Sequence, residues 1–319
     1  MSVDVIIPVY KPNHKFERLL KMLVKQTNKP NNIIILNTEV LPEYSTALIR
    51  ERIEKTLCGI HLPGTGEINI AVHSIKKDEF DHGGTRHYGA SLSNADYLLY
   101  MTQDAIPKNE FLIEKLLASF SDEMVAAAYA RQLADETAKT TEAYTRIFNY
   151  PEKSFVKSKE DKAKLGIKTY FCSNVCAMYQ REVFQSLGGF VTRTIFNEDM
   201  IYAAKAIEAD YKIAYVSEAL VIHSHNYSIE EQFHRNFDLG VSHNEYKEIF
   251  SSVPSESEGI KMVKQTMAFL LDRKEYLSMI EYFFESAAKY VGYFMGKHYS
   301  SLPKSLVIWS SMNKGYWRK

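Results

Sequence analysis

An aspartate that directly follows a short apolar segment is the first candidate for metal chemistry in this chain. Tyr97–Met101 has the apolar composition of a buried strand, and Pro107 prevents that strand from continuing. Thr102, Gln103 and Asp104 lie between them. The carboxyl ends of strands form the ligand-binding edge of an open α/β sheet. We therefore expect Asp104 to bind Mg²⁺ or Mn²⁺ together with a diphosphate. The alternative is that Asp104 begins a turn or caps the next helix.

Two glycines followed by an arginine form a second candidate site. Residues 78–90 read DEFDHGGTRHYGA, where Gly83 and Gly84 permit a tight turn and a helical segment begins at Thr85. Free amides at the start of that helix, together with Arg86, could bind a diphosphate. A glycine pair before a helix is also common in ordinary turns.

Two acids and two histidines complete the candidate residues. Glu198 and Asp199 open a helical segment, where acids suit the helix dipole; the functional alternative makes Asp199 a general base. His223 and His225 follow a predicted strand, and an imidazole there could bind the metal of Asp104 instead of being a satisfied polar residue. Ser173 and Asn174 are a polar pair buried within an apolar segment, so they could orient a ligand or bond to neighbouring backbone.

Alternating strands and helices place these residues. Near-continuous apolar segments predict buried strands, and helical spacing of apolar residues follows the first of them, which indicates a doubly wound, mostly parallel sheet. The predicted strands are 3–9, 33–36, 68–75, 97–101, 125–131, 170–179, 213–216 and 220–222, and the first predicted helix is 16–26. Residues 134–168 are polar and poor in pattern, so we expect an excursion with some helix over the site.

Composition narrows the class of protein. The chain has 319 residues, of which 45% are hydrophobic and 24% charged, as in a globular enzyme, and its formal net charge is zero. We therefore expect no nucleic-acid partner. Cys58, Cys172 and Cys176 fit neither a disulfide framework nor a common zinc site, and indicate buried, reduced thiols in a cytoplasmic protein. We expect no signal peptide and no transmembrane helix.

The C-terminal part is basic and broadly apolar. Predicted helices span 229–250, 262–271 and 276–295, with a hinge-like segment at 253–259. The last helix has a wider apolar face than a packed surface helix needs, and no acidic residue follows Glu285. These features predict peripheral association with a membrane surface. Packing on the main domain, or on a second copy in a homodimer, is the alternative.

The order of the motifs resembles the family 2 nucleotide-sugar glycosyltransferases of GT-A fold, and more narrowly the bacterial rhamnosyltransferase branch. The resemblance covers about residues 3–250. Its motifs are VDVIIPVYKP, LNTE, FDHGGTRHYGA, YMTQDAIP, YFCSNVCAMY, NEDM and HSHNYS. It implies an α/β, Rossmann-like GT-A domain over residues 1–228. A helical region, residues 229–319, would then serve the acceptor or the membrane surface.

The resemblance also implies roles for single residues. Asp199 would be the catalytic base, and Asp104 and His223 would bind the metal. The nucleotide-sugar site would comprise Pro8, Tyr10, Glu39, Asp81, Gly84, Arg86, Gln103, Asp104, Asn174 and Glu198. Thr102 replaces the first acid of the family's D-x-D motif, and Asn37-Thr38-Glu39 replaces the commoner aspartate pattern. These two departures affect metal dependence and the identity of the nucleobase.

The resemblance implies an inverting transfer with Mg²⁺ or Mn²⁺ as cofactor. The expected donor is dTDP-β-L-rhamnose, and the expected acceptor is a hydroxyl of a growing surface glycan on polyprenyl diphosphate. The enzyme would lie in the cytoplasm, on the inner face of the cell membrane. Alternatives are a UDP-sugar donor, a sugar-nucleotide pyrophosphate-cleaving enzyme and a non-catalytic scaffold.

Overall fold

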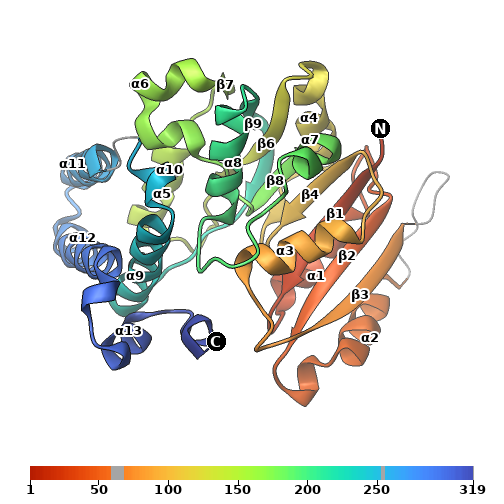
Figure 1. The fold of residues 1–319 in the computed structure, drawn as a ribbon, viewed down its shortest axis with the longest axis horizontal. Helices are drawn as coiled ribbons and strands as arrows, with labels where there is room; N and C mark the ends of the chain where they lie inside the picture. Colours follow the sequence, from red (N-terminus) through yellow and green to blue (C-terminus); the bar gives the residue numbers. More distant parts are fainter. Residues whose placement is uncertain (59–67, 253–255, 319) are drawn as a thin grey trace.

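One mixed β-sheet runs through the described part of the chain, residues 1–58, 68–252 and 256–318 of a computed structural model (Figure 1). Within these residues the sheet has nine strands in the order β3-β2-β1-β4-β8-β6-β9-β5, and β7 pairs with β9. The strands are β1 (Val3–Val9), β2 (Asn32–Glu39), β3 (Asn69–Lys76), β4 (Tyr97–Met101), β5 (Ile106–Pro107), β6 (Val125–Leu133), β7 (Phe155–Lys157), β8 (Cys176–Gln180) and β9 (Lys212–Ile222).

The strand directions bring the candidate residues to one edge of the sheet. β1 is parallel to β2 and β4, and β2 is parallel to β3. β8 is antiparallel to both β4 and β6, so β4 and β6 run in the same direction, and β9 is parallel to β6. The carboxyl ends of β4, β6 and β9 therefore lie along the same edge, as in open α/β sheets that bind ligands there.

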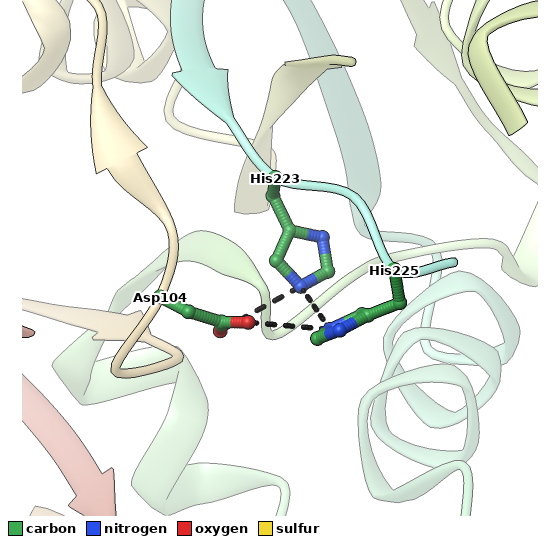
Figure 2. Close-up of side chains that lie close together, drawn as sticks. All are labelled: Asp104, His223 and His225. Atoms are coloured by element: carbon green, nitrogen blue, oxygen red, sulfur yellow. Dashed lines mark hydrogen bonds and ion pairs between the residues drawn. The ribbon is translucent and has the colours of Figure 1, made fainter. Parts of the chain in front are cut away.

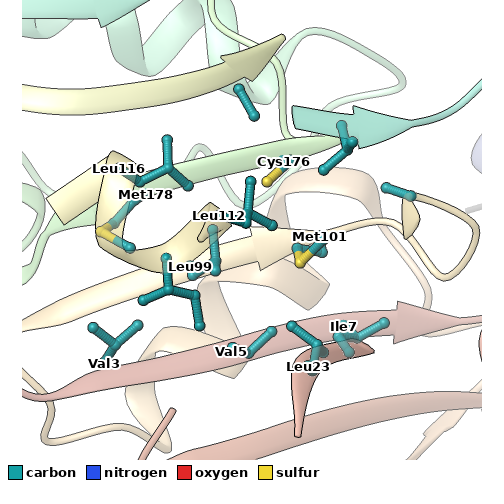
Figure 3. Close-up of a cluster of buried hydrophobic side chains, with 14 of the residues drawn as sticks. Val3, Val5, Ile7, Leu23, Leu99, Met101, Leu112, Leu116, Cys176 and Met178 are labelled. Carbon is teal, nitrogen blue, oxygen red and sulfur yellow. The ribbon is translucent and has the colours of Figure 1, made fainter. Parts of the chain in front are cut away.

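Helices cover both faces of the sheet, which confirms the α/β class. The first core lies between the sheet and α1, α2 and α4, and Figure 3 shows side chains of β1, β4, β8, α1 and α4 packed in it. The second core contains side chains of α3, α7 and α8 on the other face. These helices are α1 (His14–Leu23), α2 (Thr46–Leu57), α3 (His82–Ser91), α4 (Leu112–Ala118), α7 (Arg181–Ser186) and α8 (Glu198–Glu208).

Two sequence predictions of strands need correction, whereas the predicted excursion does contain helix and also a strand. The segments 213–216 and 220–222 form one strand, β9, because a register shift against β6 accommodates Ser217–Ala219 without ending it. Of 170–179 only the part from Cys176 is a strand, since Gly166–Tyr170 forms a 3₁₀ helix. The excursion 134–168 contains α5 (Thr140–Asn149), α6 (Lys162–Leu165) and β7, which extends the sheet. The helix α2 was not expected.

Five helices follow the sheet, and the C-terminal helical extension is confirmed. They are α9 (Ile229–Glu245), α10 (Lys247–Phe250), α11 (Glu256–Asp272), α12 (Tyr276–Lys297) and α13 (Lys304–Ser310). The predicted hinge is wrong for 256–259, which belong to α11, and 253–255 lie outside the described residues. Among the described residues, no helix is long and apolar enough to cross a membrane. All three cysteines are free thiols; Cys172 and Cys176 are buried as predicted, but the prediction is wrong for Cys58, which is exposed at the end of α2.

Candidate active site

Asp104 and two histidines converge at the carboxyl edge of the sheet. Asp104 follows β4, His223 follows β9, and His225 lies two residues further on; Figure 2 shows the three side chains pointing toward one another. Asp104 Oδ2 lies 3.2 Å from His225 Nε2, and Asp104 Oδ1 lies 3.7 Å from His223 Nε2. The two Nε2 atoms are 3.0 Å apart. One oxygen and two nitrogens thus surround one point that a cation could occupy.

Gln132 determines the tautomer of His223. This buried residue of β6 accepts a hydrogen bond at Oε1 from Arg146 Nη1, at 2.9 Å. Because a guanidinium group only donates, that contact identifies the amide oxygen. The same Oε1 lies 3.0 Å from His223 Nδ1, so Nδ1 carries the proton and donates it. The lone pair of His223 is therefore on Nε2, which faces Asp104 and His225.

The electrostatics of the cluster also fit a metal ion. Burial lowers the pKa of His223 well below its usual value, and the charge of His225 lowers it further. Burial lowers the pKa of His225 too, although Asp104 opposes that shift. Both imidazoles are therefore neutral near pH 7, which is the form that binds metals. A carboxylate and two neutral imidazoles are a suitable ligand set for a divalent cation.

The geometry adds His225 as a third candidate metal ligand, because the ligands expected from the sequence are only Asp104 and His223. The signal was present, since residues two apart in an extended segment point to the same side. Thr102, at the position of the absent acid, has a buried hydroxyl without a hydrogen-bond partner among the described residues. The second imidazole therefore gives the cluster a third ligand where the family's first acid is absent.

Glu198 and Asp199 begin α8 in two different environments. Glu198 is 5% exposed, and its Oε1 lies 3.2 Å from Arg86 Nη1 and accepts a hydrogen bond from Asn174 Nδ2 at 3.0 Å. Burial acts to raise the pKa of Glu198, but the charges of Arg86 and His82 and the hydrogen bond from Asn174 together outweigh this effect and lower it. Glu198 is therefore an ionised, paired residue. Asp199 is half-buried, which leaves it closer to solvent than Glu198.

Asp199 has the properties of a general base. Its Oδ2 accepts a hydrogen bond from the backbone N–H of Asn174 at 2.9 Å, and its Oδ1 accepts one from the backbone N–H of Met200 at 2.8 Å. Burial, followed by the negative charge of Glu198, raises the pKa of Asp199 to about 7. A base with a pKa near the working pH is efficient in proton transfer. Asn197, just before the two acids, has a φ of 66°, a left-handed conformation that asparagine tolerates and that fixes the start of α8.

Ser173 and Asn174 connect the metal-ligand cluster to the acids. Ser173 Oγ accepts from Gln132 Nε2 at 3.0 Å, and Gln132 in turn contacts His223. Asn174, the next residue, donates to both Glu198 and Asp199. Its Oδ1 accepts from Tyr179 at 2.8 Å, so the amide has partners on both sides. The buried polar pair that the sequence indicated therefore orients the site through protein contacts.

Gly83 and Gly84 lie in the first turn of α3, which begins at His82 and not at Thr85 as predicted, and they serve mainly to pack the helix. A Cβ at Gly83 would lie 1.9 Å from the Val191 carbonyl oxygen, and one at Gly84 would lie 2.9 Å from the Thr192 carbonyl oxygen. The expectation of free amides is wrong for Gly84, because its N–H donates to Asp81 Oδ1 at 2.6 Å. Asp81 Oδ2 accepts from the backbone amide of residue 194 at 3.0 Å. Both oxygens of Asp81 thus hold backbone in place.

Arg86 retains an unused donor. It is 7% exposed, and its Nε has no hydrogen-bond partner among the described residues. Since buried polar groups normally have partners, this N–H fits an anionic ligand. Arg235 of α9, which the sequence did not single out as a site residue, is a further cation, with its guanidinium 4.6 Å from the centre of the Phe196 ring. Its charge contributes, after burial, to the low pKa of His82 and His223.

The remaining predicted residues lie at the ends of β1 and β2. Gln103 bonds to the backbone of Tyr10, accepting from its N–H at 2.8 Å and donating to its carbonyl at 2.9 Å. The side chain of Tyr10 is exposed, and Pro8 lies within β1. Glu39 ends β2 and accepts at Oε1 from the Thr46 amide at 2.8 Å, at the start of α2. Gln103 and Glu39 thus make structural hydrogen bonds within the chain, and their expected roles in nucleotide-sugar binding stay predictions.

Comparison with known proteins identifies relatives over nearly the whole chain. The family model described as glycosyl transferase family 2 matches residues 4–188. The O-antigen chain rhamnosyltransferase RfbN of Salmonella typhimurium is 38% identical, and the alignment covers 99% of this chain and 96% of RfbN. The O-antigen chain rhamnosyltransferase WbaN of Salmonella anatum is 39% identical, with the same coverage of each chain.

Solved structures of low sequence identity share the fold. The mannosyltransferase PcManGT from Pyrobaculum calidifontis, in complex with GDP-Man and Mn²⁺, has a TM-score of 0.63 at 12% identity, and the match covers 92% of this chain and 86% of that one. Residues 1–349 of S. aureus TarS give a TM-score of 0.53 at 14% identity, over 94% of this chain and 91% of that one.

Proposed function

This chain belongs to glycosyl transferase family 2, and we propose that it transfers L-rhamnose from dTDP-β-L-rhamnose to a hydroxyl of a growing, lipid-linked surface polysaccharide. The sugar and the polysaccharide class are supported by the printed names of the two Salmonella relatives. The observation that carries the catalytic proposal is that a chain of hydrogen bonds through Gln132, Ser173 and Asn174 joins His223 of the Asp104–histidine cluster to Asp199. This brings a candidate metal site and a candidate base into one site.

The proposed metal ligands are Asp104, His223 and His225. Bound there, Mg²⁺ or Mn²⁺ supplies positive charge that offsets the charge growing on the nucleoside diphosphate leaving group. The two imidazoles favour Mn²⁺, because Mg²⁺ prefers oxygen ligands. Gln132 keeps the lone pair of His223 directed at this position. The contact corresponds to the hydrogen bonds that commonly orient metal-binding histidines.

Asp199 is the proposed catalytic base. It takes the proton of the acceptor hydroxyl as the oxygen attacks the anomeric carbon on the face opposite the leaving group. A single displacement inverts the anomeric configuration, so a β-linked donor gives an α-linked rhamnoside. Glu198 keeps Arg86 in place, and the free N–H of Arg86 is directed to a diphosphate oxygen, with Arg235 as a second positive charge.

The donor-binding role extends along the edge of the sheet. The nucleotide side of the proposed site is formed by Pro8, Tyr10, Glu39, Asp81, Gly84 and Gln103. Gln103 holds the backbone of Tyr10, so its contribution is to position the end of β1 beside Asp104. Asn174 has the corresponding role for the two acids of α8.

The test is a panel of nucleotide sugars incubated with Mg²⁺ or Mn²⁺, with and without a lipid-linked glycan acceptor. Release of dTDP from dTDP-rhamnose, lost in EDTA, is the expected result. Asp104→Asn should abolish it, and Asp210→Asn, at an exposed turn that asparagine also tolerates, should not. Turnover of a UDP-sugar would overturn the rhamnose assignment. Release of a nucleoside monophosphate would identify a pyrophosphate-cleaving enzyme instead.

A further inference from the structure

The outward face of α12 is apolar. Its other face packs on α9 through Gly292 and Gly296, where an added Cβ would lie 2.3 Å from the Phe233 carbonyl oxygen and 2.0 Å from the Phe237 carbonyl oxygen. The large apolar residues on the exposed face, which we call the α12 face, are Tyr276, Leu277, Ile280, Phe283, Phe284, Tyr290, Val291 and Phe294. Leu277 is 84% exposed and Phe283 is 62% exposed. A contiguous apolar surface of this kind indicates an interaction site.

The helix α13 extends this face. Trp309 of α13 is 55% exposed, and its ring lies 5.7 Å from the ring of Phe233 on α9. Gly292 of α12 packs against the backbone of the same Phe233, so α12 and α13 are neighbours on α9. In Figure 1, α11, α12 and α13 form one end of the molecule, on the side away from β3. The surface thus combines phenylalanine, tyrosine and tryptophan, as membrane-interface elements do.

The charge of the C-terminal residues favours an anionic partner. No acidic residue follows Glu285 in the sequence, whereas six lysines and arginines do, in a chain whose net charge is zero. The remainder of the chain therefore carries an equal excess of acid. Lys304 and Lys314 are exposed near the end of the chain. A two-fold dimer built on the α12 face would bring the basic ends of both copies into one interface. Neither end offers an acidic side chain that could pair with the lysines and arginines of the other.

We infer that the α12 face and the exposed C-terminal lysines, Lys304 and Lys314, dock on an anionic lipid surface. Apolar side chains enter the interface between head groups and acyl chains, and the lysines contact anionic head groups. The docked face is linked to the active site. Glu281 of α12 lies 2.5 Å from Lys139, just before α5, and α5 carries Arg146, the partner of Gln132. α9, on which α12 packs, carries Arg235.

Docking would therefore hold the active site beside the lipid surface, where a lipid-linked acceptor lies. This orientation rests on the proposed function, but the docking itself does not. A binding measurement without any sugar nucleotide can test the docking alone, so its failure is distinguishable from failure of the glycosyl transfer.

The experiment is co-sedimentation of the full chain with vesicles of phosphatidylcholine, alone or mixed with phosphatidylglycerol. We expect binding to the mixed vesicles only, weakened by salt. Leu277→Ser with Phe284→Ser should reduce the partition coefficient by about tenfold or more. Lys304→Gln with Lys314→Gln should reduce it by about fivefold for each lysine. Leu48→Ser, at an exposed leucine of α2, is the matched control and should bind normally.

Circular dichroism and gel filtration of each variant complete the test. Because the substituted side chains are exposed, the variants should fold and remain monomeric. Wild-type protein that stays in the supernatant with both vesicle types would overturn the inference. So would a wild-type dimer that Leu277→Ser with Phe284→Ser converts to a monomer, because the α12 face would then be an interface between two copies of the chain.

Discussion

At the scale of single residues, the candidate metal cluster depends on the hydrogen bond between His223 and Gln132, although Gln132 is not itself a candidate ligand. Gln132 Oε1 accepts from both Arg146 and His223, and the donor-only chemistry of arginine leaves His223 with its proton on Nδ1. Gln132 Nε2 donates to Tyr150 at 2.5 Å and to Ser173 at 3.0 Å. The buried side-chain amide of Gln132 therefore determines the tautomer of His223. Its contacts with Tyr150 and Ser173 prevent the amide group from flipping.

Replacing Gln132 should weaken metal binding. Gln132→Leu removes the acceptor for His223 Nδ1–H, and loss of such a partner typically costs about 10–100-fold in metal affinity. Gln132→Glu keeps an acceptor for both Arg146 and His223, so its affinity should stay close to that of wild type. Titration with Mn²⁺ in the presence of dTDP, followed by the electron paramagnetic resonance signal of free Mn²⁺, measures the difference. Equal affinity for Gln132→Leu and wild type would show that the contact does not orient the ligand.

The pH dependence of transfer should report Asp199. Its pKa is raised to about 7 by burial and by Glu198, and a base works only when ionised. The value of kcat/KM should therefore fall tenfold per pH unit below about 7 and level off above it. Glu198→Gln removes the neighbouring negative charge, which lowers the pKa of Asp199 and should move this acid limb to lower pH. Steady-state rates across pH measure the shift, and an acid limb that stays in place or moves to higher pH in Glu198→Gln would contradict the assignment.

At the scale of elements, three glycines allow α9 and α12 to approach closely. A Cβ at Gly240 of α9 would lie 2.2 Å from the Tyr293 carbonyl oxygen, and the corresponding atoms at Gly292 and Gly296 meet backbone of α9. Backbone cannot move aside as the end of a side chain can. This packing holds Arg235 at the site and also presents the α12 face to solvent.

Gly296→Ala should therefore destabilise the protein. Overpacking of this kind typically costs about 1–3 kcal/mol, which should lower Tm by several degrees. Gly259→Ala is the matched control, because Gly259 lies in the helix α11 with nothing within 4 Å of an added Cβ. Alanine is a better helix former than glycine, so Tm should stay constant or rise there. Thermal unfolding followed by circular dichroism gives both values; equal Tm changes in the two variants would argue against close packing.

The sequence could predict elements whose pattern is local. Strands such as β1 and β4 are continuous apolar runs that end in polar residues, and the structure confirms them. β9 was divided in the prediction because Ser217 and Glu218 interrupt its apolar pattern, and only the register with β6 shows that the strand continues. Helix α5 has no fully buried residue, so its sequence lacked the apolar stripe that marks a helix.

The resemblance to family 2 glycosyltransferases is confirmed, whereas the partners of single side chains depended on three-dimensional contacts. The amide of Gly84 is occupied by Asp81, and no spacing in the sequence could distinguish this cap from a free phosphate site. The pairing of Glu198 with Arg86 joins residues more than a hundred positions apart. Such long-range contacts decide which of the two adjacent acids is buried and paired and which lies closer to solvent.

At the scale of the whole molecule, one edge of the sheet gathers the chemistry and one group of helices presents an apolar surface. β4, β6 and β9 deliver Asp104, Gln132 and His223 because they run in the same direction. Helix α9 packs on α12 through its glycine, and its Arg235 lies over the ring of Phe196, two residues before Glu198. Helix α9 therefore supports both the proposed active site and the α12 face. The substitutions that test the glycosyl transfer differ from those that test the docking.

The central claim is that Asp199 is the base of a glycosyl transfer, and the most direct test is the rate of Asp199→Asn. Asparagine has nearly the size of aspartate, and its side-chain oxygen can still accept the hydrogen bond from the backbone N–H of Asn174. Donor binding measured by calorimetry should therefore remain close to that of wild type. The account predicts that transfer from dTDP-rhamnose to the acceptor falls by about a hundredfold or more, as general base catalysis is typically worth 10²–10⁴-fold. A variant that binds the donor and retains most of the wild-type transfer rate would contradict it.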